Sequence, residues 1–164
     1  MKEVFVRADR CLGCLSCRLA CAVEHSASKS LFGAITESPT PRSRLFVEKA
    51  DSLNIPLTCR HCDPAPCEEA CVAGSITRDS RGAVVQNENR CIGCWTCMMV
   101  CPYGVVTRQQ DRKVAVKCDR CQDREVPACV GACPTKALLF AEPDEFEASV
   151  RKHRAGVLMH ALAE

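Results

Sequence analysis

The fold is set by one short run, Arg90-Cys91-Ile92-Gly93-Cys94-Trp95-Thr96-Cys97-Met98-Met99-Val100-Cys101-Pro102. Its first three cysteines are separated by two residues each, the fourth follows after three more residues, and a proline comes directly after it. A tight loop with this spacing aims three soft thiolates and several backbone N-H groups at one compact core. The run therefore predicts ligands for an iron-sulfur cluster.

Further copies of this run account for all of the cysteines in the chain. The 16 cysteines divide into Cys11, Cys14, Cys17 and Cys21; Cys59, Cys62, Cys67 and Cys71; Cys91, Cys94, Cys97 and Cys101; and Cys118, Cys121, Cys129 and Cys133. Each set opens with a two-residue gap and closes with a three-residue gap, while the middle gap is two, four, two and seven residues. This internal repeat predicts four 4Fe-4S clusters.

The fourth cysteine of each set lies about one helical turn beyond the third, so it points past the first cluster, and in two-cluster ferredoxins it binds the partner cluster. We therefore expect crossed ligation, with the second and third sets joined as one pair and the first and fourth as another. The expected sites are site 1 (Cys11, Cys14, Cys17, Cys133), site 2 (Cys118, Cys121, Cys129, Cys21), site 3 (Cys59, Cys62, Cys67, Cys101) and site 4 (Cys91, Cys94, Cys97, Cys71).

Zinc and disulfides are the alternatives for so many cysteines. Zinc modules normally combine two separated C-x2-C pairs, whereas two sets here place three cysteines within seven residues. The first ten residues contain no apolar run of signal-peptide length, so we expect a reducing cytoplasm and free thiols. The chain has only one Trp, one Tyr and five Phe, and clusters would fill the interior that large aromatics usually fill.

Charge and hydropathy exclude two classes of partner. No stretch approaches the roughly 20 apolar residues of a membrane span, and a net charge of +2 provides no basic stripe for nucleic acid. An oxidised cluster with its four thiolates carries about −2, so four clusters would bring the chain to about −6. Basic residues next to the ligands, Arg10, Arg90, Lys117 and Arg120, either offset this charge or are simply solvated.

The sequence predicts an α+β fold of small β-hairpins and short helices around the clusters. The expected strand pairs are residues 75–77 with 83–85, 105–107 with 113–116, and 3–6 with 137–140. The last pairing would join the two ends of the chain and bring the first and fourth cysteine sets together.

These pairings divide the chain into four parts. We expect an outer ferredoxin-like unit (residues 1–21 with 108–140), an insertion loop (22–58), a central ferredoxin-like unit (59–107) and a C-terminal helix (141–164). The insertion is rich in Ser, Pro and Arg and is expected to be mostly loop with one strand at residues 45–47. The tail predicts a helix capped by Asp144, with one face formed by Phe146, Val150, Val157, Leu158 and Leu162.

The chain resembles the small four-cluster, ferredoxin-like electron-transfer subunits of cytoplasmic oxidoreductases. The resemblance runs from Cys11 to Leu139 and rests on all 16 cysteines, on Cys59-Arg60-His61-Cys62-Asp63-Pro64-Ala65-Pro66-Cys67 and on Lys117-Cys118-Asp119-Arg120-Cys121. Such subunits accompany nickel carbon monoxide dehydrogenase, formate dehydrogenase, formate-linked hydrogenase and tungsten aldehyde oxidoreductase. The stretch Ala20-Cys21-Ala22-Val23-Glu24-His25-Ser26 is most similar to the branch associated with carbon monoxide dehydrogenase.

This resemblance implies a tandem, pseudo-symmetric bacterial dicluster ferredoxin fold and an electron relay without substrate chemistry. Its expected partners are a catalytic oxidoreductase subunit and a further electron carrier or flavoprotein. Two other functions remain as alternatives, a zinc-binding structural or interaction module and a cluster-dependent enzyme. The enzyme is disfavoured because the sequence lacks the C-x3-C-x2-C spacing of radical S-adenosylmethionine proteins and any G-x-G-x-x-G nucleotide-binding run.

Overall fold

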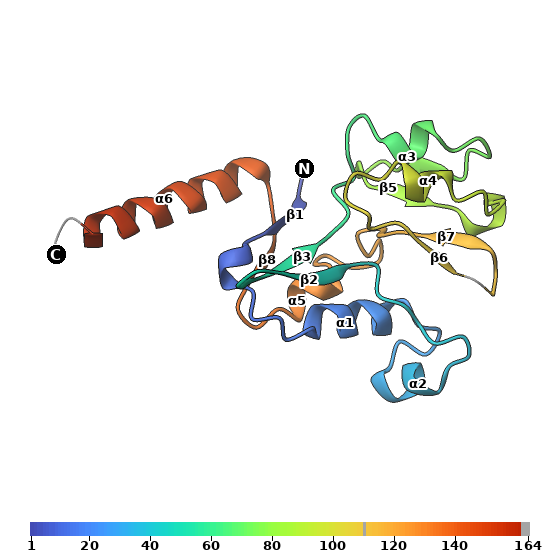
Figure 1. Cartoon of the computed structure of the whole chain (residues 1–164), viewed down its shortest axis with the longest axis horizontal. Helices are drawn as coiled ribbons and strands as arrows, with labels where there is room; N and C mark the ends of the chain where they lie inside the picture. The colour runs from blue at the N-terminus through green and yellow to red at the C-terminus, as the bar shows by residue number, and fades with distance from the viewer. Residues whose placement is uncertain (110, 162–164) are drawn as a thin grey trace.

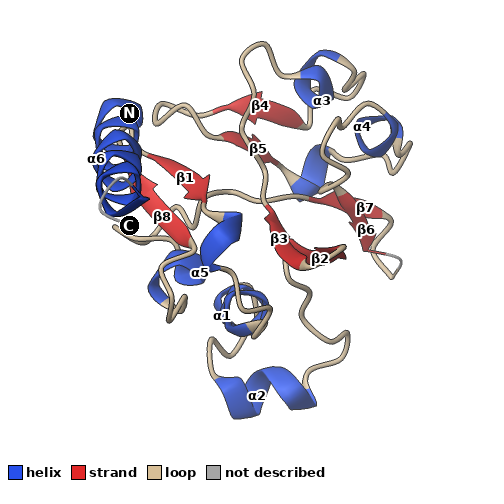
Figure 2. Cartoon of the chain, turned by 60° about the vertical axis from the view of Figure 1, so that its left-hand side comes forward, coloured by secondary structure: helices blue, strands red, loops and turns tan. Residues whose placement is uncertain are grey.

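The computed structural model describes residues 1–109 and 111–161, which form a mixture of short strands and helices (Figures 1 and 2). The strands pair as β1 (Glu3–Val6) with β8 (Leu138–Ala141), β2 (Phe46–Ala50) with β3 (Leu53–Leu57), β4 (Ile76–Arg78) with β5 (Val84–Gln86), and β6 (Thr107–Gln109) with β7 (Val114–Val116). The α-helices are α1 (Ser16–Glu24), α2 (Leu31–Thr36), α3 (Pro66–Glu69), α4 (Thr96–Met99), α5 (Ala128–Gly131) and α6 (Pro143–Ala161). Single 3-10 turns, η1 (Ala8–Arg10) and η2 (Glu88–Arg90), precede the first and third cysteine sets.

The expected strand pairs are confirmed, each displaced by one or two residues at its ends. The two ends of the chain meet in the antiparallel pair of β1 and β8, in which Glu3 lies opposite Ala141 and Val6 opposite Leu138. The two local pairs, β4 with β5 and β6 with β7, are antiparallel hairpins that flank the third cysteine set. The turn between β4 and β5 contains Asp79, Ser80 and Gly82, which are residues that favour chain reversal.

The insertion is more ordered than its composition indicates, so the expectation of a loop with one strand is wrong. Its second half is a hairpin, in which Val47 of β2 lies opposite Pro56 of β3. A proline is tolerated there because the sheet has only two strands, and each strand keeps one edge that needs no donor. Its first half contains α2, whose first turn is capped by the Ser30 hydroxyl accepting the Gly33 N-H at 3.2 Å.

Two separate apolar cores hold the molecule together, and both are built from small aliphatic side chains and cysteines. One contains Ile76, Val84, Val106 and Ala115, with cysteines of the second and third sets packed among them. The other contains Leu45 and Leu138, with cysteines of the first and fourth sets. Helix α3 accordingly packs against α4, and α1 packs against α5. The chain has few aromatic residues, and cysteine side chains take part of the place in its cores that aromatic side chains usually fill.

Helix α6 extends away from the rest of the molecule (Figure 1), and none of its residues is buried. It is attached at its first turn, where Phe146 stacks on Phe5 with ring centroids 4.2 Å apart, and where Glu142 binds the N-terminal amine. The helix begins at Pro143, so Asp144 lies inside its first turn and is not the cap that the sequence predicts. Leu162 and the last residues of the expected tail helix lie outside the described residues. Of the helices described, none is long and apolar enough to cross a membrane.

Candidate iron-sulfur centres

The four cysteine loops share one backbone feature. The residue before the second cysteine of each set has a left-handed conformation: φ is +70° at Gly13, +48° at His61, +70° at Gly93 and +61° at Arg120. Glycine adopts this conformation without a steric penalty, whereas His61 and Arg120 adopt it with a side chain that is buried. The repeat is therefore present in the backbone of all four loops, although only two of them contain the glycine that would reveal it in the sequence.

The outer sets bring their thiols together in two groups. Burial raises the pKa of the Cys17 thiol, and electrostatic repulsion from Cys133, Cys11 and Cys14 raises it further, so these four thiols are neighbours. Burial also raises the pKa of Cys129, with further repulsion from three cysteines of expected site 2, Cys118, Cys21 and Cys121. Both groups contain three members of one set and the last member of the other.

The central sets line two cavities. One cavity is lined by Cys59, Cys62, Cys67 and Cys101, together with His61 and Lys117. The other is lined by Cys71, Cys91, Cys94 and Cys97, together with Trp95. These two groups of four cysteines have the same composition as expected sites 3 and 4, and in each the last cysteine comes from the other set.

The sulfur atoms of the four groups fit a thiolate-bound cluster. Burial is the main cause that raises the pKa of Cys97 to about 11, of Cys121 to about 11 and of Cys118 to about 12, so as free thiols they stay neutral and need a cationic core to become thiolates. Backbone N-H groups also donate to the sulfurs, as is common around iron-sulfur clusters. Examples are Arg44 to Cys21, Ser75 to Cys71 and Ala137 to Cys133, each at 3.2 Å between N and Sγ.

Two cysteines differ from the others by being exposed. Cys14 and Cys94 are the second members of the first and third sets, and they belong to expected sites 1 and 4. Their pKa is lowered, chiefly by hydrogen bonds with the hydroxyl groups of Ser16 and Thr96, which are the first residues of α1 and α4.

Thiols of different groups are also near enough to influence one another. Cys17 of the first group raises the pKa of Cys129 in the second, and Cys59 of the third group raises the pKa of Cys118 in the second. Cys67 of the third group likewise raises the pKa of Cys97 in the fourth. Group 1 therefore neighbours group 2, group 2 neighbours group 3, and group 3 neighbours group 4. The exposed Cys14 and Cys94 belong to groups 1 and 4.

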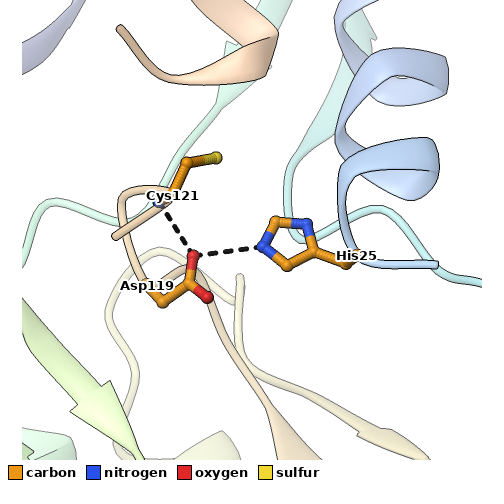
Figure 3. Close-up of side chains that lie close together, drawn as sticks. All are labelled: His25, Asp119 and Cys121. Carbon is orange, nitrogen blue, oxygen red and sulfur yellow. Dashed lines mark hydrogen bonds and ion pairs between the residues drawn. The ribbon is translucent and has the colours of Figure 1, made fainter. Parts of the chain in front are cut away.

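A polar network surrounds Cys21 (Figure 3 shows part of it). His25 Nδ1 lies 2.7 Å from the Cys21 carbonyl oxygen, and Nε2 lies 3.1 Å from Asp119 Oδ1, which also accepts the Cys121 N-H at 2.9 Å. Arg44, from the insertion, binds the other Asp119 oxygen at 2.6 Å. Burial alone would lower the pKa of His25, but its bonds to Asp119 and Cys21 outweigh burial and raise that pKa to about 9. The insertion thus contributes directly to the surroundings of expected site 2, which its loop-like sequence does not indicate.

The structure also separates the basic residues that flank the ligands. Lys117 is 2% exposed and Arg120 is 6% exposed, whereas Arg90 is exposed. Burial, followed by the charges of Lys117 and Arg120, lowers the pKa of His61 to about 3, so His61 is neutral and its Nδ1 accepts the Val84 N-H at 3.0 Å.

Comparison with known proteins identifies the family of this chain. Residues 50–143 match the model of the 4Fe-4S dicluster domain. The chain is 39% identical to an iron-sulfur protein of Rhodospirillum rubrum, over 93% of this chain and 88% of the relative. It is 37% identical to the electron transport protein HydN of Escherichia coli strain K12, over 95% of this chain and 97% of the relative. It is 34% identical to the thiosulfate reductase electron transfer subunit PhsB of Salmonella typhi, over 84% of this chain and 74% of the relative.

Proposed function

Because the chain belongs to the 4Fe-4S dicluster domain family of iron-sulfur proteins, we propose that it is an electron-transfer subunit that holds four 4Fe-4S clusters and serves a catalytic oxidoreductase subunit. The observation that carries the proposal is the gathering of the cysteines into four groups, each with three members of one set and the last member of another. Soft thiolates in groups of four are the usual ligands of such clusters. Relatives named as an electron transport protein and an electron transfer subunit support the same role.

The proposed ligands are those of crossed ligation. Site 1 takes Cys11, Cys14, Cys17 and Cys133; site 2 takes Cys118, Cys121, Cys129 and Cys21; site 3 takes Cys59, Cys62, Cys67 and Cys101; and site 4 takes Cys91, Cys94, Cys97 and Cys71. The division into an outer unit, an insertion, a central unit and a tail helix, and the tandem, pseudo-symmetric arrangement of the two units, are parts of the same proposal. The two cores support it, because one contains cysteines of the outer pair and the other those of the central pair.

The residues of the chain explain how such a subunit would work. When bound, the clusters supply reversible one-electron transfer. Three of the four thiols of site 2 are buried, and buried valines line the cavity of site 3. Both features keep water away from the inner sites, which lowers the dielectric constant around them. Cys14 and Cys94 are exposed, so sites 1 and 4 are the ends that a partner can approach. A line of four sites with two accessible ends suits transfer between two different proteins.

We assign the partners by class. One end serves a catalytic subunit of the carbon monoxide dehydrogenase, aldehyde oxidoreductase, formate dehydrogenase or hydrogenase type, with the carbon monoxide dehydrogenase type preferred on the sequence resemblance. The other end serves a further electron carrier or flavoprotein, and we place the complex in the cytoplasm. Anaerobic purification of the complex from its native cells, followed by identification of the bound subunits, tests this assignment. Recovery with none of these classes of enzyme would refute it.

Cluster content and ligation are tested on the isolated protein. Anaerobically purified chain should be brown and contain about 16 irons, four for each of four cubane clusters. Cys133→Ser should give the same change in electron paramagnetic resonance (EPR) spectrum and iron content as Cys11→Ser, whereas Cys129→Ser should match Cys21→Ser. If Cys133→Ser instead matches Cys129→Ser, ligation is not crossed. Colourless, zinc-loaded protein would refute the relay and favour the zinc module.

A further inference from the structure

Two buried cations, Lys117 and Arg120, lie beside the cysteines without an acidic partner. Lys117 is 2% exposed and Arg120 is 6% exposed. In the part of the chain that the structure describes, neither side chain forms an ion pair with a carboxylate. The nearest acidic residue in sequence, Asp119, is already bound by Arg44 and His25.

Backbone carbonyl groups are the partners that the two cations do have. The Lys117 ammonium donates to the carbonyl oxygen of Val84 and, at 3.1 Å, to that of Cys118. Arg120 donates from Nη1 to the Arg81 carbonyl oxygen at 3.3 Å, and its buried Nε has no hydrogen-bond partner among the described residues. A carbonyl group is a dipole and offsets only part of a full charge, so burial of these cations requires a negative charge nearby.

The two cations lie next to ligands of the inner sites. Lys117 lines the cavity of site 3, where its charge acts on the Cys67 thiol, and it is bonded to Cys118, a ligand of site 2. Arg120 stands between two ligands of site 2, Cys118 and Cys121. Sites 2 and 3 are thus the anionic groups that these cations face, if each bound cluster and its thiolates carry about −2.

The outer site 4 offers a direct comparison. Arg90 precedes Cys91 just as Lys117 precedes Cys118, so the two cations occupy the same position in their cysteine sets. Arg90 is exposed, and water and salt screen its charge. The charge of Lys117 is buried and is screened much less.

We propose that Lys117 and Arg120 are positioning residues that hold the inner sites 2 and 3 at a higher reduction potential than the outer sites 1 and 4. The inference rests on the four-cluster function proposed above. Reduction adds one negative charge, and a fixed buried cation favours the state with the added charge. One electron leaves an outer site and one enters an inner site, and no atom or proton moves with it. Electrons therefore collect in the middle of the protein and leave when an oxidised partner removes them at either end.

Lys117→Met is the direct test, with Lys117→Arg as the conservative variant and Arg90→Met as the matched control. Iron content is measured first, and the midpoint potential of each cluster is then measured by anaerobic redox titration followed by EPR. Lys117→Met should make reduction of an inner cluster at least tenfold less favourable, which is about 59 mV for one electron. Lys117→Arg and Arg90→Met should each change it less than threefold. An iron-loaded Lys117→Met protein with unchanged potentials would overturn the proposal.

Lys117→Met could lose its iron, so the wild-type protein provides a second test. A soluble dysprosium chelate speeds the electron-spin relaxation of clusters near the surface and spares shielded ones. The first cluster reduced in the titration should keep its relaxation rate when the chelate is added, because it is an inner cluster. If the first signal responds to the chelate, the proposal is wrong even though the clusters are present. Wild-type protein without iron-sulfur clusters would instead refute the proposed function itself.

Discussion

Substitution of Gly93 by alanine should damage the third cysteine loop more than the same change at Gly13 damages the first. Both glycines have φ of +70°, where any other residue costs about 1–2 kcal/mol. A Cβ at Gly93 would lie 2.4 Å from the Lys113 carbonyl oxygen, which belongs to the backbone and cannot rotate away. A Cβ at Gly13 would meet the side chain of Asn54 at 2.8 Å, and that side chain can move. We expect Gly13→Ala to lower the free energy of unfolding by about 1–2 kcal/mol. Gly93→Ala should lower it by the same amount plus about 1–3 kcal/mol for the overlap with the Lys113 carbonyl.

The measurement is anaerobic guanidinium denaturation of the iron-loaded variants, followed by cluster absorbance and circular dichroism. Iron-loaded proteins need not unfold in two states, so the midpoints of the variants are compared directly. Gly93→Ala should have the lower midpoint, and it should lose its first irons from site 4, whose ligands Cys91 and Cys94 flank the glycine. Adding Asn54→Ala to Gly13→Ala should restore the part of the stability loss that comes from overlap with the Asn54 side chain. Equal midpoints for the two alanine variants would refute the role given to the Lys113 carbonyl.

Three further changes test other parts of the molecule. Removal of iron with a chelator under reducing conditions should abolish most far-ultraviolet circular dichroism, because the cores are organised around thiols; an unchanged spectrum would contradict this. Phe146→Ala should release α6 and speed its cleavage by trypsin without loss of iron, whereas Val157→Ala, at an exposed position, should do neither. Asp119→Asn should weaken the bonds to Arg44 and His25 at a cost of about 2 kcal/mol, seen as a lower denaturation midpoint; an unchanged midpoint would show that the network adds no stability.

The elements that sequence patterns predict well are those whose signals are local. Residues 75–85 contain two short β-branched runs around a polar turn, and they form the hairpin of β4 and β5. The pairing of β1 with β8 is also predicted correctly, because apolar runs at the two ends have no closer partner. The crossed cysteine groups stay a prediction from spacing, in which a gap of three residues directs the last cysteine toward the neighbouring cluster.

The insertion shows where local signals fail. Its strand β3 contains Pro56, a residue that argues against a strand. It forms as the partner of β2, which is held in place where Leu45 and Val47 pack in the core that contains the first and fourth cysteine sets. Helix α2 has only six residues and exposes Phe32 and Ile35, so its sequence contains no buried apolar stripe that would predict a helix. Packing outweighs composition at the β2–β3 hairpin, whereas α2 depends on the local cap that Ser30 provides.

Burial of flanking charges is likewise decided by distant parts of the chain. Arg90-Cys91 and Lys117-Cys118 are equivalent in sequence, yet Lys117 is buried because the Val84 carbonyl group and the central core enclose it. The polar network at Cys21 similarly joins His25 and Asp119, which are 94 residues apart. A pattern of spacings predicts ligands, whereas it contains no information on which residues will surround them.

The pairing of β1 with β8 has a consequence for biosynthesis. Glu3 must find Ala141, whereas Ile76 needs only Gln86, so the central hairpins can close on a nascent chain long before the ribosome has made the partner of the first strand. The partner of the Cys17 thiol, Cys133, is also translated late. We therefore expect the hairpin of β4 and β5 to form before β1 pairs with β8, so that the first cysteine set is completed last.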